Sequence, residues 1–375
     1  MKVFENINID FISKRKVAYI VSGTLIILGL LSLAFRGLEF GIDFKGGTDI
    51  ALKFDDAINI SQIRAELEQL GLGNIEVKTF GGETGILLRT ELQSVPTEIY
   101  GGVITGIQNS ILRYEPNAQI SISDSTDNSV TIGFADIQIA NKVDSKLQND
   151  GFQTSRLDDN NVIIRVGIAD WIEGELRNKM PDNHFVVQKE DHVGPKIGSE
   201  LKQDSIISVV LALLGILIYL GFRFKFIFAL GAVVALFHDV LITLGVFALL
   251  HGIIPGLNLE ISISVVAAFL TLVGYSINDT VVVFDRIREN IKIHKTASLL
   301  DNINNAINIT MRRTIITSLT TLFVVAVLLI FGGDVLRGFA FALTFGIIVG
   351  TYSSIFVASP FIYEYVQRTK KNIQF

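Results

Sequence analysis

Long apolar runs are the main pattern along this 375-residue chain. A membrane-spanning helix needs about 20 predominantly apolar residues. Six segments reach or approach that length, which predicts spans at residues 17–36, 205–222, 226–250, 261–284, 314–331 and 336–363. The first run is longer than the apolar region of a secretory signal, which has about 7–15 residues, so we expect it to remain as a span.

Between the first two spans the pattern changes to short strands and amphipathic helices, which is typical of a soluble α+β region. The order βαββαβ occurs twice, in residues 37–127 and 128–204, and Phe54 corresponds to Phe134 at an offset of 80 residues. Chance similarity between βαβ patterns is the alternative explanation. We expect two tandem ferredoxin-like units, each with a free sheet face or edge that can accept an extended peptide.

Basic residues mark one side of the predicted spans. They occur in residues 1–16, between the second and third spans, in the loop 285–313 and in the tail 364–375. Cytoplasmic loops carry the excess of Lys and Arg, so the membrane α-helical part is expected to have both termini in the cytoplasm and residues 37–204 outside.

Charge and composition exclude several classes of function. Residues 37–204 hold 15 Lys+Arg and 27 Asp+Glu, a balance of −12, whereas the remainder holds 17 and 10, a balance of +7. The acidic region lacks the basic surface that nucleic-acid binding requires. No cysteine, P-loop, dinucleotide fingerprint or His-x-x-x-His pair occurs, so we expect neither a metal nor a nucleotide cofactor.

Asp279 lies inside the fourth apolar run. A charged Asp near the centre of a spanning helix costs about 2.5–3.5 kcal/mol, so it must pair, reach water or bind a proton. Helical spacing places Tyr275, Asn278 and Asp279 on one face. The expected cation is Arg313 at the start of the fifth span, from which Thr317 continues a polar stripe. A static Asp–Arg pair that locks two spans together is the alternative.

Two further groups are candidates. His238 and Asp239 lie in the third span, and histidine titrates in the physiological range; a polar packing contact is the alternative for both. After the first span Asp43 is expected to cap a turn, and two glycines, Gly46 and Gly47, to supply the positive φ that a tight turn needs.

Several of these segments carry a family resemblance. They are GIDFKGGT at 41–48, VGPKIG at 193–198 with Gly194 and Pro195, His238-Asp239, GYSINDTVVVFDR at 274–286 and RRT at 312–314. Together they resemble the SecD/SecF family of the Sec protein-export machinery, and its SecF members in particular, within the resistance-nodulation-division (RND) superfamily.

The resemblance implies an RND-type half of six transmembrane helices that pairs with SecD in the bacterial inner membrane. It also implies association with the SecYEG channel, with YajC and YidC as further candidates, and a translocating polypeptide as the substrate. Protons are the implied coupling ion, and Asp279 and Arg313 match the family's proton-pathway positions. A second external unit is a departure, because a typical SecF has one small external domain.

Other functions remain open from the residues. A proton-driven half-transporter of small solutes would need a solute pocket. An intramembrane aspartyl protease would need Asp239 and Asp279 to share a proton; we expect no enzyme. A non-conducting structural subunit is the remaining alternative.

Overall fold

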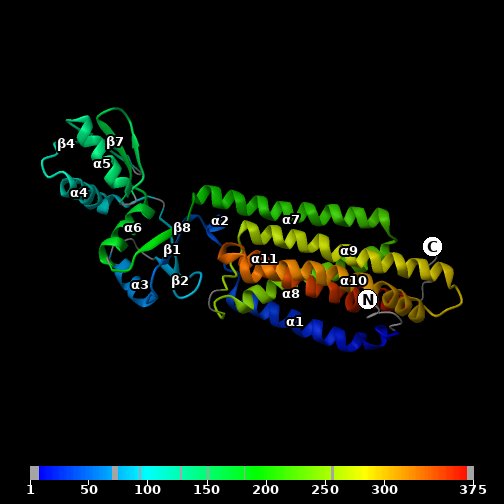
Figure 1. Ribbon diagram of the computed structural model, residues 1–375. Helices are drawn as coiled ribbons and strands as arrows, with labels where there is room; N and C mark the ends of the chain where they lie inside the picture. Colours follow the sequence, from blue (N-terminus) through cyan, green and yellow to red (C-terminus); the bar gives the residue numbers. More distant parts are fainter. Residues whose placement is uncertain are drawn as a thin grey trace. The chain divides into compact units, whose positions relative to one another are not determined.

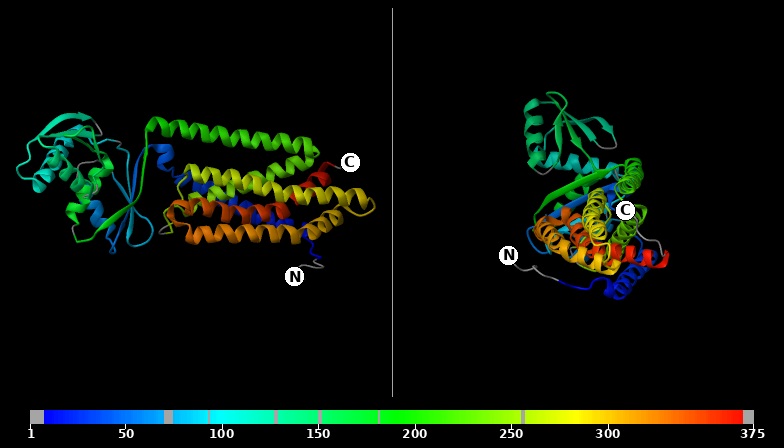
Figure 2. Two further views of the ribbon diagram at one scale, coloured as in Figure 1. Left: turned by 45° about the horizontal axis from the view of Figure 1, so that its top comes forward. Right: turned by 90° about the vertical axis from the view of Figure 1, so that its right-hand side faces the viewer.

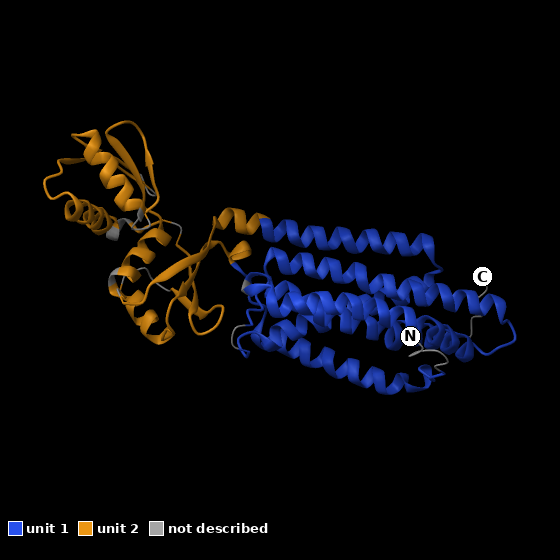
Figure 3. Ribbon diagram, in the orientation of Figure 1, with its two compact units in different colours: residues 1–41, 201–375 blue, residues 42–200 orange. Residues whose placement is uncertain are grey.

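The computed structural model describes residues 8–69, 75–92, 94–126, 129–149, 152–180, 182–254 and 257–369. They form two compact units, coloured separately in Figure 3. We call residues 1–41 and 201–375 the membrane unit and residues 42–200 the sheet unit. The predicted boundary between residues 127 and 128 and the tail beyond residue 369 lie outside the described residues.

Within the described residues, six helical segments are long and apolar enough to cross a membrane, which confirms the predicted number. They are α1 (Arg15–Arg36, after the 3-10 turn η1, Ile12–Lys14), α7 (Pro195–Arg223), α8 (Phe226–Leu250), α9 (Ile263–Ile293), α10 (Leu299–Phe331) and the succession α11 (Gly333–Ser353), η2 (Ser354–Ala358) and α12 (Ser359–Thr369).

The predicted loop 285–313 is mostly helical. α9 continues to Ile293 and α10 begins at Leu299, so the two spans extend beyond their apolar cores. Ser298 caps α10, because its hydroxyl accepts a hydrogen bond from the backbone N–H of Asp301. Figure 1 shows α9 and α10 as two of the long helices of the membrane unit.

The last span is not a continuous α-helix. A π-helical turn, η2, separates α11 from α12. Pro360 follows it, and a proline lacks the N–H that the preceding turn of an α-helix needs. The Ser359 hydroxyl donates to the Ser354 carbonyl oxygen at 2.8 Å, five residues back, which supplies a replacement hydrogen bond.

The sheet unit contains two four-stranded antiparallel sheets. The first has the order β2-β3-β1-β8 and the second the order β4-β5-β7-β6. The strands are β1 (Gly47–Phe54), β2 (Glu76–Thr79), β3 (Gly85–Thr90), β4 (Ile120–Thr126), β5 (Ser129–Phe134), β6 (Thr154–Arg156), β7 (Asn161–Arg165) and β8 (Phe185–Val193), and the helices are α2 (Ile42–Lys45), α3 (Ile60–Glu68), α4 (Thr97–Tyr114), α5 (Ile137–Asn149) and α6 (Ile168–Lys179). Figure 2 gives two further views of these elements.

The two sheets are nested, whereas the sequence predicts consecutive units divided at residue 128. The element order along the chain is βαββαβ twice, but β8 pairs with β1 and β4 pairs with β5. Helix α6 packs on β1 and α3, and α4 packs on α5. We call residues 42–95 and 167–200 the base and residues 97–166 the insert.

A short connection explains why the predicted division fails. Strand β4 ends at Thr126 and β5 begins at Ser129, and these two residues pair with each other in an antiparallel ladder. The predicted boundary therefore falls inside a hairpin of the insert. The insert interrupts the base between β3 and α6, so both connections to the membrane unit belong to one sheet.

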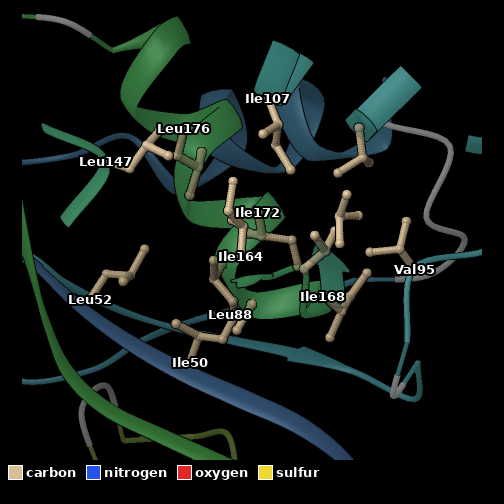
Figure 4. Close-up of a cluster of buried hydrophobic side chains, with 14 of the residues drawn as sticks. Ile50, Leu52, Leu88, Val95, Ile107, Leu147, Ile164, Ile168, Ile172 and Leu176 are labelled. Carbon is tan, nitrogen blue, oxygen red and sulfur yellow. The ribbon is translucent and has the colours of Figure 1, made fainter. Parts of the chain in front are cut away.

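Base and insert share a continuous hydrophobic core. Figure 4 shows part of it, where Ile50 and Leu52 of β1, Ile172 of α6 and Ile164 of β7 are labelled. All four side chains are fully buried. This burial provides the main free-energy gain that holds the nested elements together.

The two glycine motifs meet in the base. Gly46 and Gly47 have φ of 77° and 126°, which confirms the prediction of positive φ. A Cβ on Gly47 would lie 2.4 Å from the Thr90 carbonyl oxygen, and one on Gly46 would lie 2.8 Å from Cα of Pro195. Asp43 lies in the first turn of α2, half-buried.

The second motif begins the helix that continues into the membrane unit. Pro195 is the first residue of α7, where its missing N–H is tolerated, and the Gly194 carbonyl oxygen accepts from the N–H of Gly198 at 2.8 Å. Gly47 pairs with Val193, so the start of β1 and the end of β8 form one corner of the base.

Candidate functional site

Two polar clusters lie inside the membrane unit. The first surrounds Asp239 of α8, whose residue is 1% exposed. One carboxylate oxygen of Asp239 lies 2.8 Å from Nδ1 of His238. The other accepts hydrogen bonds from the hydroxyls of Ser276 on α9 at 2.5 Å and Ser353 on α11 at 2.8 Å. Three helices thus converge on one buried carboxylate, an environment that can stabilise negative charge.

His238 extends this first cluster to α1. Its Nε2 lies 2.9 Å from the hydroxyl of Ser22, and its ring stacks on Tyr352 with centroids 6.1 Å apart. The Tyr352 hydroxyl in turn donates to the backbone carbonyl of Ala18 at 3.0 Å. His238 and Asp239 therefore form a continuous polar network that links α1 to α11.

Glycines let the helices approach closely enough for these contacts. A Cβ on Gly29 of α1 would lie 3.0 Å from Cα of Gly245 on α8. A Cβ on Gly350 of α11 would lie 3.2 Å from Cβ of Ser276 on α9. The small residues reduce the separation between helix axes, so short serine side chains reach across the interfaces.

The second cluster surrounds Asp279 of α9, whose residue is 3% exposed. Its carboxylate accepts from the hydroxyl of Ser318 on α10 at 3.3 Å. Ser318 also contacts the hydroxyl of Thr351 on α11 at 2.7 Å and accepts from the Tyr275 hydroxyl at 3.3 Å. Asp279 is therefore much less well solvated by protein donors than Asp239.

The expected ion pair between Asp279 and Arg313 is not formed: no described basic nitrogen lies within 4.0 Å of this carboxylate. Arg313 acts on it through charge without contact, and its own side chain is exposed. Helix geometry gives the reason. Ser318 occupies the level of Asp279 on α10, and Arg313 lies five residues earlier, about 7.5 Å along the axis.

Other predicted residues lie around this second cluster. Asn278 is exposed on α9, and Thr317 is half-buried on α10. The Thr317 carbonyl accepts from the hydroxyls of Thr320 and Thr321 at 2.9 and 3.0 Å, so these threonines satisfy their helix rather than Asp279.

The structure does not bring Asp239 and Asp279 into a shared hydrogen bond. The partners of Asp239 are His238 and two serines, and the partner of Asp279 is Ser318. An aspartyl-protease dyad needs carboxylates that share a proton, and the arrangement of these two carboxylates gives that alternative no support.

Six hydroxyl residues of the two clusters were not predicted. They are Ser22, Ser276, Ser318, Thr351, Tyr352 and Ser353. Ser276 precedes Asp279 by three residues on the same helical face, but its hydroxyl donates to Asp239 on α8, so this spacing does not predict the contact. The others come from distant spans, and only helix packing shows that they meet the carboxylates.

In the described ranges, no group of three or more His, Asp or Glu side chains is placed to hold a metal ion.

Two family models match the chain. The model described as protein export membrane protein SecD/SecF, C-terminal, matches residues 173–368, and the SecD/SecF GG motif matches residues 31–58. These ranges contain Asp239 and Asp279 as well as Gly46 and Gly47.

Curated relatives match over nearly the full length. A protein translocase subunit SecF from Rhodothermus marinus is 42% identical over 364 residues, which are 97% of this chain and 95% of that protein. One from Calditerrivibrio nitroreducens is 36% identical over 359 residues, 95% of this chain and 93% of that protein.

Solved structures agree with these relatives. The crystal structure of SecDF, a translocon-associated membrane protein from Thermus thermophilus, matches with a TM-score of 0.66 and 29% identity over 98% of this chain. A SecDF structure in the super-membrane-facing form matches with a TM-score of 0.57 and 28% identity over 97% of this chain. The chain spans 40% of the length of each SecDF chain.

Proposed function

This chain belongs to the SecF family of protein translocase subunits, and we propose that it acts with SecD to use the proton gradient in completing polypeptide translocation across the bacterial inner membrane. The observation that carries the proposal is Asp279, a buried carboxylate in a spanning helix with one hydroxyl donor and no ion pair within the described residues. Protons are the coupling ion, and no other cofactor takes part.

Asp279 has a reason to change its charge. An ionised Asp at the centre of a spanning helix costs about 2.5–3.5 kcal/mol, and a single hydrogen bond of 3.3 Å to Ser318 offsets only part of that cost. Proton binding removes the charge, whereas the nearby charge of Arg313 favours the ionised form. A carboxylate between these two influences can load and release a proton during a transport cycle.

A change in the charge of Asp279 can affect the packing of neighbouring helices. The Asp279–Ser318–Thr351 contacts join α9, α10 and α11, so a change in charge alters the contacts among three helices. Asp239 on α8 is linked to two of the same helices, because its carboxylate accepts hydrogen bonds from Ser276 on α9 and Ser353 on α11. We assign Asp239 and His238 to the same proton pathway, with the carboxylate as the proton-holding group and the imidazole as its neighbour.

Polar residues on the outer surface of α9 and α10 support a partner in the membrane. Asn278 on α9 and Arg313 on α10 are exposed, although they belong to spanning helices. Polar groups facing hydrocarbon are costly, and they normally face other helices. We propose that SecD covers this face, and that the assembly associates with SecYEG, with YajC and YidC as further candidates.

Two covalent connections would carry the motion to the sheet unit, which we place outside the membrane with both termini in the cytoplasm. α1 leads through α2 into β1, and β8 leads into α7. Both connections enter the base at the corner that Gly47 and Val193 form. A shift of the helices would thus act on a single sheet, and through it on the emerging polypeptide.

The alternative of a small-solute half-transporter has less support. A crevice of about 170 Å³ between α7, α8 and α9 is lined by apolar side chains such as Leu213, Leu244 and Phe269. An apolar crevice does not supply the polar groups that would orient a hydrophilic solute. The following experiment distinguishes proton coupling from the remaining alternative, in which the chain is a non-conducting structural subunit.

The test is export of a secreted reporter in cells that carry Asp279→Asn. Export should slow at least tenfold at unchanged abundance and unchanged co-purification with SecD, because asparagine cannot bind a transferable proton. Asp279→Glu should retain a measurable rate. Asp285→Asn, at an exposed carboxylate paired with Arg223 at 2.8 Å, is the matched control and should leave export unchanged. Undiminished export by Asp279→Asn would reject proton coupling at this residue.

A further inference from the structure

One buried threonine of the membrane unit leaves its hydroxyl unsatisfied. Thr314 lies on α10 and is 2% exposed, yet its Oγ1 has no hydrogen-bond partner within the described residues. A buried polar group without a partner destabilises a fold, because it has lost its bonds to water and gained none in return. Such a group in a folded protein calls for a functional or a solvent-based explanation.

Other threonines of the spanning helices show how a hydroxyl is normally satisfied there. It donates to the backbone carbonyl four residues earlier, at distances between 2.7 and 3.0 Å, as in Thr24, Thr243, Thr271, Thr310, Thr320 and Thr321. For Thr314 the equivalent acceptor is the carbonyl of Thr310, and the hydroxyl does not bond to it. The Thr314 hydroxyl therefore remains available to a partner outside its own helix.

Thr314 lies one turn from the residue that donates to Asp279. Thr310, Thr314 and Ser318 recur every four residues and are all buried, so they share the inner face of α10. Ser318 donates to the Asp279 carboxylate at 3.3 Å. Four residues rise about 6 Å along a helix, a gap that bound water can bridge.

The Asp279 carboxylate can hold the other end of such a bridge. Ser318 donates to Oδ2, whereas Oδ1 accepts no hydrogen bond from the described residues. An ionised carboxylate has about four acceptor sites, so most of this capacity is free. A buried water needs about two to four polar partners, and Asp279 and Thr314 supply two of them.

The direction from Asp279 to Thr314 leads towards the cytoplasm in the proposed topology. Exposed Arg313 immediately precedes Thr314, and basic residues mark the cytoplasmic boundary of a span. In the same direction on α9, the next turn contains Val283 and Phe284, which are buried and apolar. Thr314 thus provides a polar group at a level where these two residues provide none.

Two other buried hydroxyls lack partners within the described part of the membrane unit. They belong to Ser32 on α1 and Thr344 on α11. Neither lies within one turn, along its own helix, of a residue that donates to Asp239 or Asp279. Thr314 therefore has the more direct relation to a buried carboxylate.

We propose that Thr314 is a positioning residue on the cytoplasmic side of Asp279, and that its hydroxyl holds the water through which Asp279 releases its proton. The neutral carboxyl gives its proton to this water, which passes a proton to the next water on the cytoplasmic side. Asp279 is left as the carboxylate, and the Thr314 hydroxyl is unchanged. This inference rests on the proposed function of Asp279 and assigns a residue to the release step.

Two substitutions at Thr314 separate this role from packing. Valine keeps the shape but lacks the hydroxyl, so Thr314→Val should slow reporter export about fivefold, the effect of about one hydrogen bond on a rate. It should keep or raise the unfolding temperature, because the hydroxyl bonds to no other described part of the protein. Thr314→Ser keeps the hydroxyl and loses a buried methyl group, so it should export close to the wild-type rate and unfold at a lower temperature.

Thr310→Val is the matched control. Thr310 is buried on the same face of α10, one turn away, and its hydroxyl donates to the carbonyls of Ala306 and Ile307 at 2.9 and 3.2 Å. This variant should export at the wild-type rate. Export is measured in cells at matched protein abundance, and the unfolding temperature is measured on the purified full-length chain by the loss of helical circular dichroism.

Wild-type export by Thr314→Val would overturn the proposal. So would equal losses in Thr314→Val and Thr310→Val, or slow export by Thr314→Val together with a lower unfolding temperature, because both results indicate packing. Asp279→Asn in the same strain separates the two proposals. If it exports slowly while Thr314→Val exports normally, only the role of Thr314 is rejected; if both export normally, proton coupling at Asp279 is rejected as well.

Discussion

Ser353 and Ser354 are adjacent, fully buried serines with different partners. The hydroxyl of Ser353 lies 2.8 Å from the Asp239 carboxylate, whereas that of Ser354 donates to the backbone carbonyl of Thr351. Hydrogen bonds to a charged group contribute about 1.5–3 kcal/mol, more than a neutral bond within a helix. The same Ser→Ala substitution at the two positions therefore compares the loss of a donor to the carboxylate with the loss of a neutral hydrogen bond within a helix.

We predict that Ser353→Ala slows reporter export several-fold, because Asp239 loses one of its donors, whereas Ser354→Ala stays close to the wild-type rate. Export kinetics in cells with matched protein abundance measure the difference. Equal losses in the two variants would mean that the serines contribute through packing alone.

At this scale the sequence identified the carboxylates but not their partners. Asp239 and Asp279 stand out because a charged residue within an apolar run is rare. Asp279 and Arg313 form no ion pair within the described residues, since the helical offset between α9 and α10 places Ser318 opposite the carboxylate, although the charge of Arg313 still acts on it. Serines in spanning segments give no distinctive signal, because they also satisfy their hydrogen bonds within their own helix.

The apolar pattern predicted the positions of the secondary-structure elements better than it predicted which strands pair. All six spanning segments were predicted, and α8 has the predicted bounds, Phe226–Leu250. The π-helical turn η2 was not predicted, because the apolar residues 355–358 keep the segment within the predicted span. Pro360 was the local clue, since a proline in a helix requires the preceding turn to rearrange.

The glycines that begin β1 yield a prediction about element geometry. Gly47→Ala should lower the stability of the sheet unit by about 2 kcal/mol, because a φ of 126° is strained for alanine and its Cβ would meet the Thr90 carbonyl oxygen. Thermal unfolding followed by the emission of Trp171 measures the loss.

Gly101→Ala in α4 is the control for that substitution. Its Cβ would meet nothing within 4 Å, and alanine in a helix interior gains about 0.5–1 kcal/mol over glycine. Its unfolding temperature should equal or exceed that of the wild type. A similar loss in both variants would contradict the assigned role of the backbone at Gly47.

For the whole molecule, nesting changes how the external region relates to its family. The sequence suggested two consecutive units, with one connection to the membrane in each. Instead β1 and β8 pair along their length, so both connections lead into the base. Residues far apart in sequence form this pairing, and element patterns alone do not specify which strands meet.

Nesting predicts opposite outcomes for two deletions of similar size. Replacing residues 97–166 by a short Gly/Ser linker removes the insert but keeps β2, β3, β1 and β8, so the base should remain folded and the protein should accumulate in membranes. Deleting residues 129–193 removes β8, which leaves β1 without its partner and opens the corner where Gly47 meets Val193. That variant should be degraded.

Immunoblots of membrane fractions and limited proteolysis of the base compare the two variants. Accumulation of the second variant without the first would favour consecutive units. Because α1 leads through α2 into β1 and β8 leads into α7, the first variant should also keep the connections through which motion in the membrane unit reaches the sheet unit.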